Sequence, residues 1–375
     1  MTPDDARIAR PPAPRSPARR APTRLIEGPR DRERIPTVVV PDHDDLAVLL
    51  ADRVAEVIAR ETAAKGRCVL GLATGSTPLG IYRELIRRHQ AGEVDLSRVV
   101  TFNLDEYYPM PPDSPHSYRR YMWENLFAHV DIRPEHVHIP DGSVPRERLA
   151  EHCDAYERAI AEAGGIDLQL LGIGKSGHIG FNEPGSSQDS RTGLAILDTV
   201  TRKDAAADFF GEDNVPREAI TMGVATILDA REIALIATGE HKADIVARAV
   251  EGEVSPDVAA TFLQRHGNAT AYLDLAAAAE LTRIKTPWVL SSVDWTPELT
   301  ERATVWAAEQ TGKALLKLTA RDYAEHHLSP LVAKHGAPGP SMGSCSIACG
   351  TRFAAAGGCR PTRRCWCSPR TPTTT

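Results

Sequence analysis

Short runs of apolar residues alternate along this 375-residue chain with longer stretches in which apolar residues recur at helical spacing. The runs predict buried strands at 37–41, 68–72, 99–104, 136–139, 166–171, 232–238 and 269–274. The spaced stretches predict helices near 44–64, 78–90, 117–128, 145–163, 223–229, 240–251 and 274–281. Apolar strands that alternate with amphipathic helices are typical of a parallel sheet covered on both faces. The pattern predicts an α/β fold with a doubly wound, mostly parallel, Rossmann-like sheet.

The same pattern divides the chain into four parts. Residues 37–282 carry the strands and helices of the α/β domain, and residues 283–336 form a helical extension. Residues 1–36 are rich in Pro and Arg and have no apolar periodicity, so we expect them to be disordered. Residues 337–375 also lack an apolar face and are expected to be disordered.

Charge is distributed unevenly over these parts. Residues 1–36 have nine Arg against five acidic residues, and residues 337–375 have five Arg and no acidic residue. The net charge of −6 therefore leaves −15 for residues 37–336. A domain this acidic repels phosphate backbones, which argues against a nucleic-acid partner. A phosphate bound by this domain must be held by donors grouped at one site.

Composition also bears on the compartment. No apolar run approaches the roughly 18 residues of a membrane span. The first residues include Asp4 and Asp5 and form neither a signal nor a transit peptide. Cys68 and Cys153 are the only cysteines in the first 340 residues, which favours a reducing compartment. We expect a cytoplasmic protein without a membrane partner.

Polar segments follow three of the predicted strands, at 73–77, 105–108 and 172–187, and the first and third of them contain glycine. Ligands of open parallel sheets bind beyond the carboxyl ends of the strands. Because these ends meet at one edge of the sheet, the three segments are expected to form one site.

The first segment ends in Gly75, Ser76 and Thr77, directly before a helix that has Pro78 at its start. Free backbone amides at a helix start, together with two hydroxyls, can bind an anion. The segment lacks the Gly-Lys-Ser/Thr ending of a nucleotide-binding loop, so ATP is not implied. Taken alone, an ordinary strand-to-helix turn explains it equally well.

The other two segments carry ionisable side chains. Asp105 comes where an apolar strand meets solvent and could act as a general base, although a lone Asp is more often a cap. In the third segment, His178 and Glu183 lie five residues apart with Asn182 between them. A carboxylate that fixes the imidazole tautomer lets such a pair transfer protons near neutral pH. This grouping in one glycine-rich segment favours catalysis over a structural role.

Together, the three segments resemble the motifs of one known family. The stretches GLATGSTP (71–78), TFNLDEYY (101–108) and GHIGFNEPGSS (177–187) look like those of the glucosamine-6-phosphate deaminase family. The likeness covers about 37–280, and the combination of three motifs in this order is specific.

The resemblance implies an enzyme that converts glucosamine 6-phosphate and water to fructose 6-phosphate and ammonia, without a metal or organic cofactor. His178 would open the sugar ring with Glu183 as its partner. Asp105 would move a proton between C2 and C1 of the open sugar.

The resemblance also implies how the substrate, a small phosphorylated amino sugar, is bound. Gly75, Ser76 and Thr77 would hold its phosphate, with Lys242 as a point charge opposite. Whether the chain forms a homo-oligomer is left open by the sequence.

Three positions depart from the family pattern. Well-studied members have an Asp where this chain has Ser176, two residues before the histidine, and a hydroxyl cannot supply that negative charge. An Arg that helps to bind phosphate in some members falls within 205–210, where this chain has none. Gly193 and Ala195 replace basic residues used for allosteric activation by N-acetylglucosamine 6-phosphate, so that regulation is expected to be absent.

Two other functions are weighed against this one. A 6-phosphogluconolactonase would share the fold and the phosphate loop, but such enzymes typically read Asp-Glu-Arg where this chain has Asp105, Glu106 and Tyr107. A non-catalytic sugar-phosphate-sensing module would not need both Asp105 and His178.

The C-terminal tail holds five cysteines between Cys345 and Cys367, but their spacing fits no standard zinc module and no His or acidic residue accompanies them. Read one base earlier from codon 365, the tail is compatible with a strand that ends in the His-Pro-Asp-Asp motif of zinc-dependent de-N-acetylases. Some long family members continue into such a domain. We therefore expect residues 337–375 to be a frameshifted tail.

Overall fold

The computed structural model of the protein describes residues 25–335. These residues belong to two compact units that divide between Leu281 and Thr282. The expectations for residues 1–24 and for the cysteine-rich tail lie outside the described residues.

The first unit is built around a sheet of seven strands in the order β1-β10-β9-β6-β2-β3-β5, and every pairing in it is parallel. The strands are β1 (Thr37–Val40), β2 (Cys68–Leu72), β3 (Val99–Asn103), β5 (Val137–His138), β6 (Leu168–Gly172), β9 (Ile233–Ala237) and β10 (Ala269–Asp274). Each corresponds to a strand that the apolar runs predict. The predicted α/β fold with a mostly parallel sheet is confirmed.

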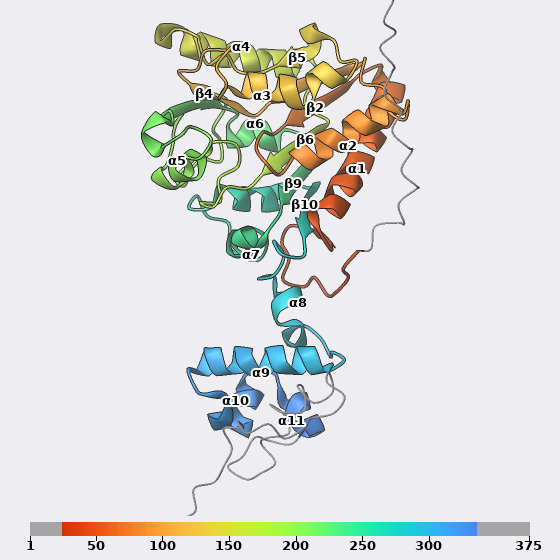
Figure 1. Ribbon diagram of the computed structural model, residues 1–375, viewed down its shortest axis with the longest axis vertical. Coiled ribbons are helices and arrows are strands. Elements are labelled where there is room, and N and C mark those ends of the chain that lie inside the picture. The colour runs from red at the N-terminus through yellow and green to blue at the C-terminus, as the bar shows by residue number, and fades with distance from the viewer. Residues whose placement is uncertain (1–24, 336–375) are drawn as a thin grey trace, which may run out of the picture. The chain divides into compact units, whose positions relative to one another are not determined.

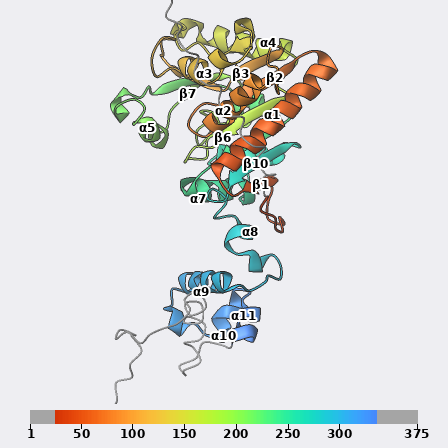
Figure 2. The same cartoon turned by 45° about the vertical axis from the view of Figure 1, so that its right-hand side comes forward.

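The helices of this unit are α1 (His43–Lys65), α2 (Leu79–Gln90), α3 (Tyr118–Asn125), α4 (Leu149–Glu162), α5 (Thr199–Ala205), α6 (Val224–Leu228) and α7 (Ala243–Glu251). Figure 1 shows α1 and α2 side by side against the sheet, and Figure 2 shows the same pair after rotation. Helix α1 begins where the Asp42 side chain accepts a hydrogen bond from the amide of Asp45, and it ends at Gly66 in the left-handed conformation.

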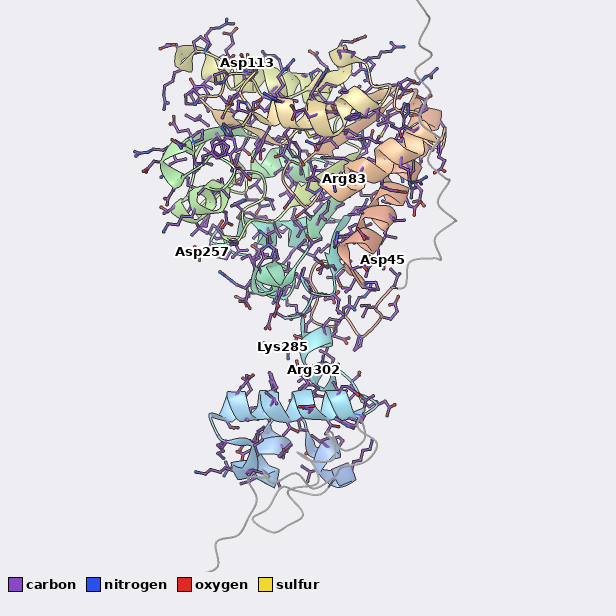
Figure 3. All side chains as sticks on the ribbon, in the orientation of Figure 1. Asp45, Arg83, Asp113, Asp257, Lys285 and Arg302 are labelled. Atoms are coloured by element: carbon purple, nitrogen blue, oxygen red, sulfur yellow. The ribbon has the colours of Figure 1, made fainter. Side chains whose placement is uncertain are left out.

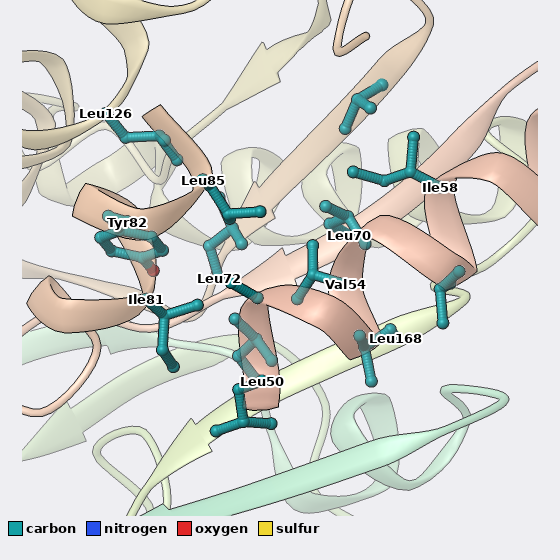
Figure 4. Close-up of a cluster of buried hydrophobic side chains, with 14 of the residues drawn as sticks. Leu50, Val54, Ile58, Leu70, Leu72, Ile81, Tyr82, Leu85, Leu126 and Leu168 are labelled. Atoms are coloured by element: carbon teal, nitrogen blue, oxygen red, sulfur yellow. The ribbon is translucent and has the colours of Figure 1, made fainter. Parts of the chain in front are cut away.

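The main hydrophobic core lies between these helices and the sheet. Leu50, Val54 and Ile58 recur at helical spacing on α1 and are buried against strands β2 and β6 (Figure 4). Ile81, Tyr82 and Leu85 of α2 complete the same cluster. Burying side chains of this size contributes about 1.5–3 kcal/mol each to folding.

The predicted helix at 274–281 is wrong. After β10 the chain makes a series of turns, in which the amide of Ala279 donates to the carbonyl of Ala276 and that of Leu281 to the carbonyl of Ala278. The Asp274 carboxylate accepts from the amides of Gly239 and Ala277, which ties the start of this segment to the end of β9. In this described segment, only the amide of Ala278 makes a helical bond, to the carbonyl of Asp274, and the other two backbone bonds join residues three apart, as in successive turns.

A second, antiparallel sheet of three strands was not foreseen. It has the order β4-β8-β7, with β4 at Asp105–Tyr108, β7 at Gly193–Ile196 and β8 at Glu218–Thr221. Residues 105–108, expected to be a polar loop, are therefore a buried strand. The amide of Leu104 donates to Leu72 of β2, and its carbonyl accepts from Met222 beyond β8, so the chain passes directly from one sheet to the other.

Residues 25–36, the described part of the segment expected to be disordered, are packed on the first unit. Ile35 is fully buried. The amide of Ile26 donates to Val39, and that of Arg34 donates to Val250. This segment has neither helix nor strand, so its sequence carries no periodicity by which to recognise it.

The second unit contains the helical extension. Its helices are α8 (Thr282–Lys285), α9 (Pro297–Thr311), α10 (Ala320–Glu325) and α11 (Ser329–His335). Its core includes Trp288, whose ring centroid is 5.6 Å from that of Trp306. Thr296 caps α9 at its start, and Gly312 ends it with a positive φ.

The strand order of the large sheet fixes where a ligand can bind. From β2 the chain continues outward through β3 to β5, and from β6 it continues in the opposite direction through β9 to β10. Neighbouring strands whose connections leave in opposite directions open a crevice at their carboxyl ends. Here that point lies between β2 and β6, the strands that precede the first and third predicted segments.

Candidate active site

A cavity of about 430 Å³ lies at the carboxyl ends of β2 and β6. Six of the eight residues predicted for the site line it: Gly75, Ser76, Thr77, Asp105, His178 and Lys242. The remaining two, Ser176 and Glu183, contact the side chain of His178. The structure thus brings together residues from four separate parts of the sequence.

The loop after β2 forms one wall of the cavity. Gly75 has φ +101°, a conformation that side chains rarely adopt, and its carbonyl accepts a 2.6 Å hydrogen bond from the Tyr121 hydroxyl. In the described part of the chain, no backbone bond outside helices and strands uses the amides of Gly75, Ser76 or Thr77. Helix α2 starts directly after them; Figure 3 labels Arg83 on this helix. The loop can therefore donate amides and hydroxyls to an anion.

Lys242 lies in the short 3-10 helix Glu240–Lys242 that leads into α7. Among residues 25–335, no ion pair or hydrogen bond holds its ammonium group. Burial lowers its pKa; the charge of Asp204 opposes this shift and that of Lys175 adds to it. An unpaired cation in a partly buried cavity favours the binding of an anionic group.

Three side chains surround one nitrogen of His178. Its Nδ1 atom lies 2.9 Å from Ser176 Oγ, 3.1 Å from Thr201 Oγ1 and 3.2 Å from Glu183 Oε2. Because Nδ1 is occupied by these partners, the other ring nitrogen, Nε2, remains for a ligand.

Glu183 supplies the negative charge behind the histidine. Burial raises its pKa, but hydrogen bonds from His178, Thr201 and the amide of Asp198 outweigh that effect, so the net shift is downward. The Ser176 hydroxyl also donates to Glu183, at 3.2 Å. Ser176 therefore bridges the pair, and Glu183 itself contacts the imidazole.

The backbone around His178 is shaped by glycine and by two polar side chains. A Cβ atom on Gly174 would lie 2.1 Å from the His178 ring, so only glycine fits there. Asn182 donates to the carbonyls of Ile179 and Met222, and the amide of Phe181 donates to Thr221 Oγ1. These bonds attach the segment to β8, the strand paired with β4.

The first residue of β4, Asp105, pairs with Thr221 in the antiparallel register. Its side chain is 6% exposed and lines the cavity. Burial, followed by the charge of neighbouring Glu106, raises the pKa of Asp105 to about 8. A carboxyl group with a raised pKa that faces a cavity is suited to accept and return a proton.

Glu106 does not line this cavity and has a structural role. Its carboxylate accepts hydrogen bonds from the amides of Tyr107, Tyr118 and Arg119, which fixes the start of α3. Burial raises its pKa to about 7, although these three amides lower it.

Several residues of the cavity were not predicted. Thr201, Asp204 and Asp208 come from α5 and the turn after it, and Lys175 comes from the segment before His178. The Tyr107 and Tyr118 hydroxyls, 3.3 Å apart, belong to the same cavity. The sequence did contain one signal: residues 201, 204, 205 and 208 recur at the spacing of one helical face.

No group of three or more His, Cys, Asp or Glu side chains between residues 25 and 335 is arranged to hold a metal ion. No helix within that range is long and apolar enough to cross a bilayer.

The sequence profile of the family described as glucosamine-6-phosphate isomerases/6-phosphogluconolactonase matches residues 41–272. Glucosamine-6-phosphate deaminase 2 of Bacillus subtilis is 50% identical over 230 residues, which cover 60% of this chain and 91% of that protein. The solved structure of a monomeric glucosamine-6-phosphate deaminase covers 66% of this chain and all of its own, with 40% identity and a TM-score of 0.63.

A longer relative matches beyond the family domain. A glucosamine-6-phosphate deaminase-like protein of Bacteroides thetaiotaomicron is 41% identical over 304 residues, or 81% of this chain. The chain spans about half of that protein, since the match covers 46% of its length. The family match over residues 41–272 and the shared fold show that the chain belongs to the glucosamine-6-phosphate isomerase/6-phosphogluconolactonase family.

Proposed function

We propose that this chain is a glucosamine-6-phosphate deaminase, which converts glucosamine 6-phosphate and water to fructose 6-phosphate and ammonia. The observation that carries the proposal is the position of Asp105 and His178 in the same cavity as the anion-binding loop and Lys242. A sugar held there by its phosphate has a proton donor and a general base within the same 430 Å³.

The first step is opening of the sugar ring. His178 donates a proton from Nε2 to the ring oxygen while the bond between that oxygen and C1 breaks and the C1 hydroxyl loses its proton to water, which leaves an aldehyde at C1. Glu183, 3.2 Å from Nδ1, stabilises the protonated imidazole. Ser176 and Thr201 hold the ring in this orientation.

The second step moves a proton along the open chain. Asp105 removes the proton from C2 and returns it to C1, while O1 gains a proton and the C2 nitrogen loses one. The aldehyde at C1 thereby becomes an alcohol and the amine at C2 becomes an imine. Water then adds to the imine carbon, and ammonia leaves as the carbonyl of fructose 6-phosphate forms. One carboxylate suffices because the proton leaves and returns on adjacent carbons.

The lactonase and sensor alternatives are less well supported. Lactone hydrolysis has no proton to move between carbons, so it gives no reason for a buried carboxyl with the raised pKa of Asp105. A sensing module needs the phosphate loop and Lys242, but not a proton donor and a base in the same cavity. The named deaminases are the relatives at 40–50% identity.

We place this reaction in the cytoplasm, in the breakdown of N-acetylglucosamine and related amino sugars. The buried free thiols Cys68 and Cys153 support a reducing compartment. No organic cofactor or metal is required by the steps above.

The proposal is tested by the release of ammonia from glucosamine 6-phosphate by the purified chain. Formation of fructose 6-phosphate in equal amount is expected. Hydrolysis of 6-phosphogluconolactone with no release of ammonia would favour the lactonase, and binding without turnover would favour the sensor.

Replacement of Lys242 by Ala is expected to raise KM for glucosamine 6-phosphate by about 10- to 100-fold, because a charged hydrogen bond to phosphate contributes about 1.5–3 kcal/mol. The effect on glucosamine, which lacks the phosphate, should be much smaller. Steady-state kinetics with both sugars measure the difference. Equal losses on both would make Lys242 a structural residue.

The pH dependence of kcat/KM should follow the ionisation of Asp105. Since the proton acceptor must be ionised, kcat/KM is expected to rise with pH through about 8, the pKa to which burial raises this carboxyl. Replacement of Glu106 by Gln removes the neighbouring negative charge and should shift this rise to lower pH. Rates between pH 6 and 10 measure the profile, and a flat profile over that range contradicts the assignment.

A further inference from the structure

Lys175 is a cation of the cavity to which neither the sequence motifs nor the steps above give a role. It precedes Ser176 on the segment that carries His178, and it lines the cavity. Its Nζ atom lies 2.5 Å from Oδ1 of Asp204 on α5. Both side chains are partly solvent-exposed, at 47% and 36%. The ion pair therefore connects two walls of the cavity at its opening.

Lys175 and Lys242 line the same cavity. The positive charge of Lys175 contributes to the lowered pKa of Lys242, whereas the negative charge of Asp204 counteracts it. Asp204 therefore offsets part of the repulsion between the two cations.

If Lys242 is the only cation that binds the phosphate, the positive charge in the cavity is smaller than the negative charge of the phosphate. No arginine lines the cavity in the described part of the chain. Asp204 and Asp208 line it on the α5 side and repel an anion. A phosphate monoester carries about −1.5 to −2 charges near neutral pH. The amides and hydroxyls of residues 75–77 are neutral, so a single lysine cannot match that charge.

We propose that Lys175 is a second phosphate-binding residue, which Asp204 holds in the empty site and which transfers to the substrate phosphate on binding. This inference rests on the proposed function, since it concerns the phosphate of the same substrate. The exchange is favourable because an exposed ion pair between single charges is weak, whereas a lysine bond to a doubly charged phosphate in a cavity is stronger.

The test compares four variants for binding and turnover. Lys175→Met removes the charge and keeps most of the side-chain length, and Lys175→Arg retains the charge. Asp204→Asn frees Lys175 from its partner. Lys203→Met is the matched control, because Lys203 is an exposed lysine beside Asp204 that does not line the cavity.

Calorimetry of fructose 6-phosphate and of fructose without ammonium, where no reaction can occur, gives the affinities, and steady-state kinetics with glucosamine 6-phosphate give KM and kcat. We expect Lys175→Met to weaken binding of the phosphorylated sugar about tenfold or more, with kcat changed much less. Lys175→Arg should recover most of this loss. Asp204→Asn should tighten binding by about two- to fivefold, since it removes the competing carboxylate. Lys203→Met should resemble the unmodified protein.

Two results overturn the inference: equal affinity in Lys175→Met and Lys203→Met, or a loss in Lys175→Met that is the same for both sugars. The second result would mean that the substitution disturbs the His178 segment. Calorimetry does not depend on turnover, so a failure of the deaminase proposal, seen as binding without ammonia release, is distinguishable from a failure of this one.

Discussion

Replacement of Asp105 by Asn should lower kcat by about 10²- to 10⁴-fold, the range typical of a lost general base. The amide keeps the shape of the carboxyl group but cannot accept the proton from C2. Binding of glucosamine 6-phosphate should change little, because Gly75, Ser76, Thr77 and Lys242 hold its phosphate on other walls of the cavity.

The direct measurement is incorporation of solvent tritium at C1. The unmodified protein should exchange this hydrogen, and the Asn variant should not. Tritium incorporation that persists in the variant would show that another group moves the proton. Retained affinity, measured by calorimetry, separates loss of chemistry from loss of folding.

The same substitution should also change stability, in a direction that depends on pH. The pKa of Asp105 rises from 3.8 in the unfolded chain to about 8 in the folded protein. A raised folded-state pKa means that the stability present below about pH 4 is lost as pH increases through about 8. The Asn variant has no buried charge at this position. The difference in free energy of unfolding, variant minus unmodified protein, should therefore be more positive at pH 9 than at pH 4. Urea unfolding at both pH values measures this difference.

Most of the large sheet could be predicted from the sequence because its strands are short, buried and apolar. CVLGL at 68–72 has no polar position, and all five residues are buried in β2. Strands of this kind are marked by continuous apolar runs, and the helices between them by their spacing.

The small sheet could not be predicted, because its strand β4 contains polar residues although it is buried. Its strand β4 reads DEYY, with two acidic residues that suggest a loop, yet all four residues are buried. Glu106 is accommodated by three backbone amides from α3 and β4, contacts that depend on tertiary structure. No local pattern shows that a carboxylate will be satisfied in this way.

The role of Ser176 could not be predicted from the sequence either. Loss of the usual Asp implied a histidine with less negative charge nearby, but the spacing of five residues could not show that Glu183 reaches the same nitrogen. In the structure, Glu183 contacts Nδ1 directly, and Ser176 and Thr201 add hydroxyl contacts to that atom. Thr201 comes from α5, 23 residues after His178 in the sequence.

Replacement of His178 by Gln should impair ring opening much more than the later proton transfer. Glutamine can still form hydrogen bonds with Glu183 and Ser176, but its amide is too weak an acid to donate a proton to the ring oxygen near neutral pH. We expect turnover of glucosamine 6-phosphate to fall by about 10²- to 10⁴-fold, the usual contribution of a general acid. Thr201→Val is the matched variant: it removes one contact to Nδ1 and should cost about tenfold or less.

A substrate that cannot form a ring separates the two steps. In 5-deoxyfructose 6-phosphate the hydroxyl that closes the ring is missing, so with ammonium present its C1 hydrogen can exchange with solvent without ring opening. In the Gln variant this exchange should stay close to the rate of the unmodified protein, because Asp105 and the phosphate-binding residues are intact. Equal losses on the ring-forming and the open-chain sugar would contradict the assignment, since they would mean that His178 acts in the proton transfer itself or supports the whole cavity.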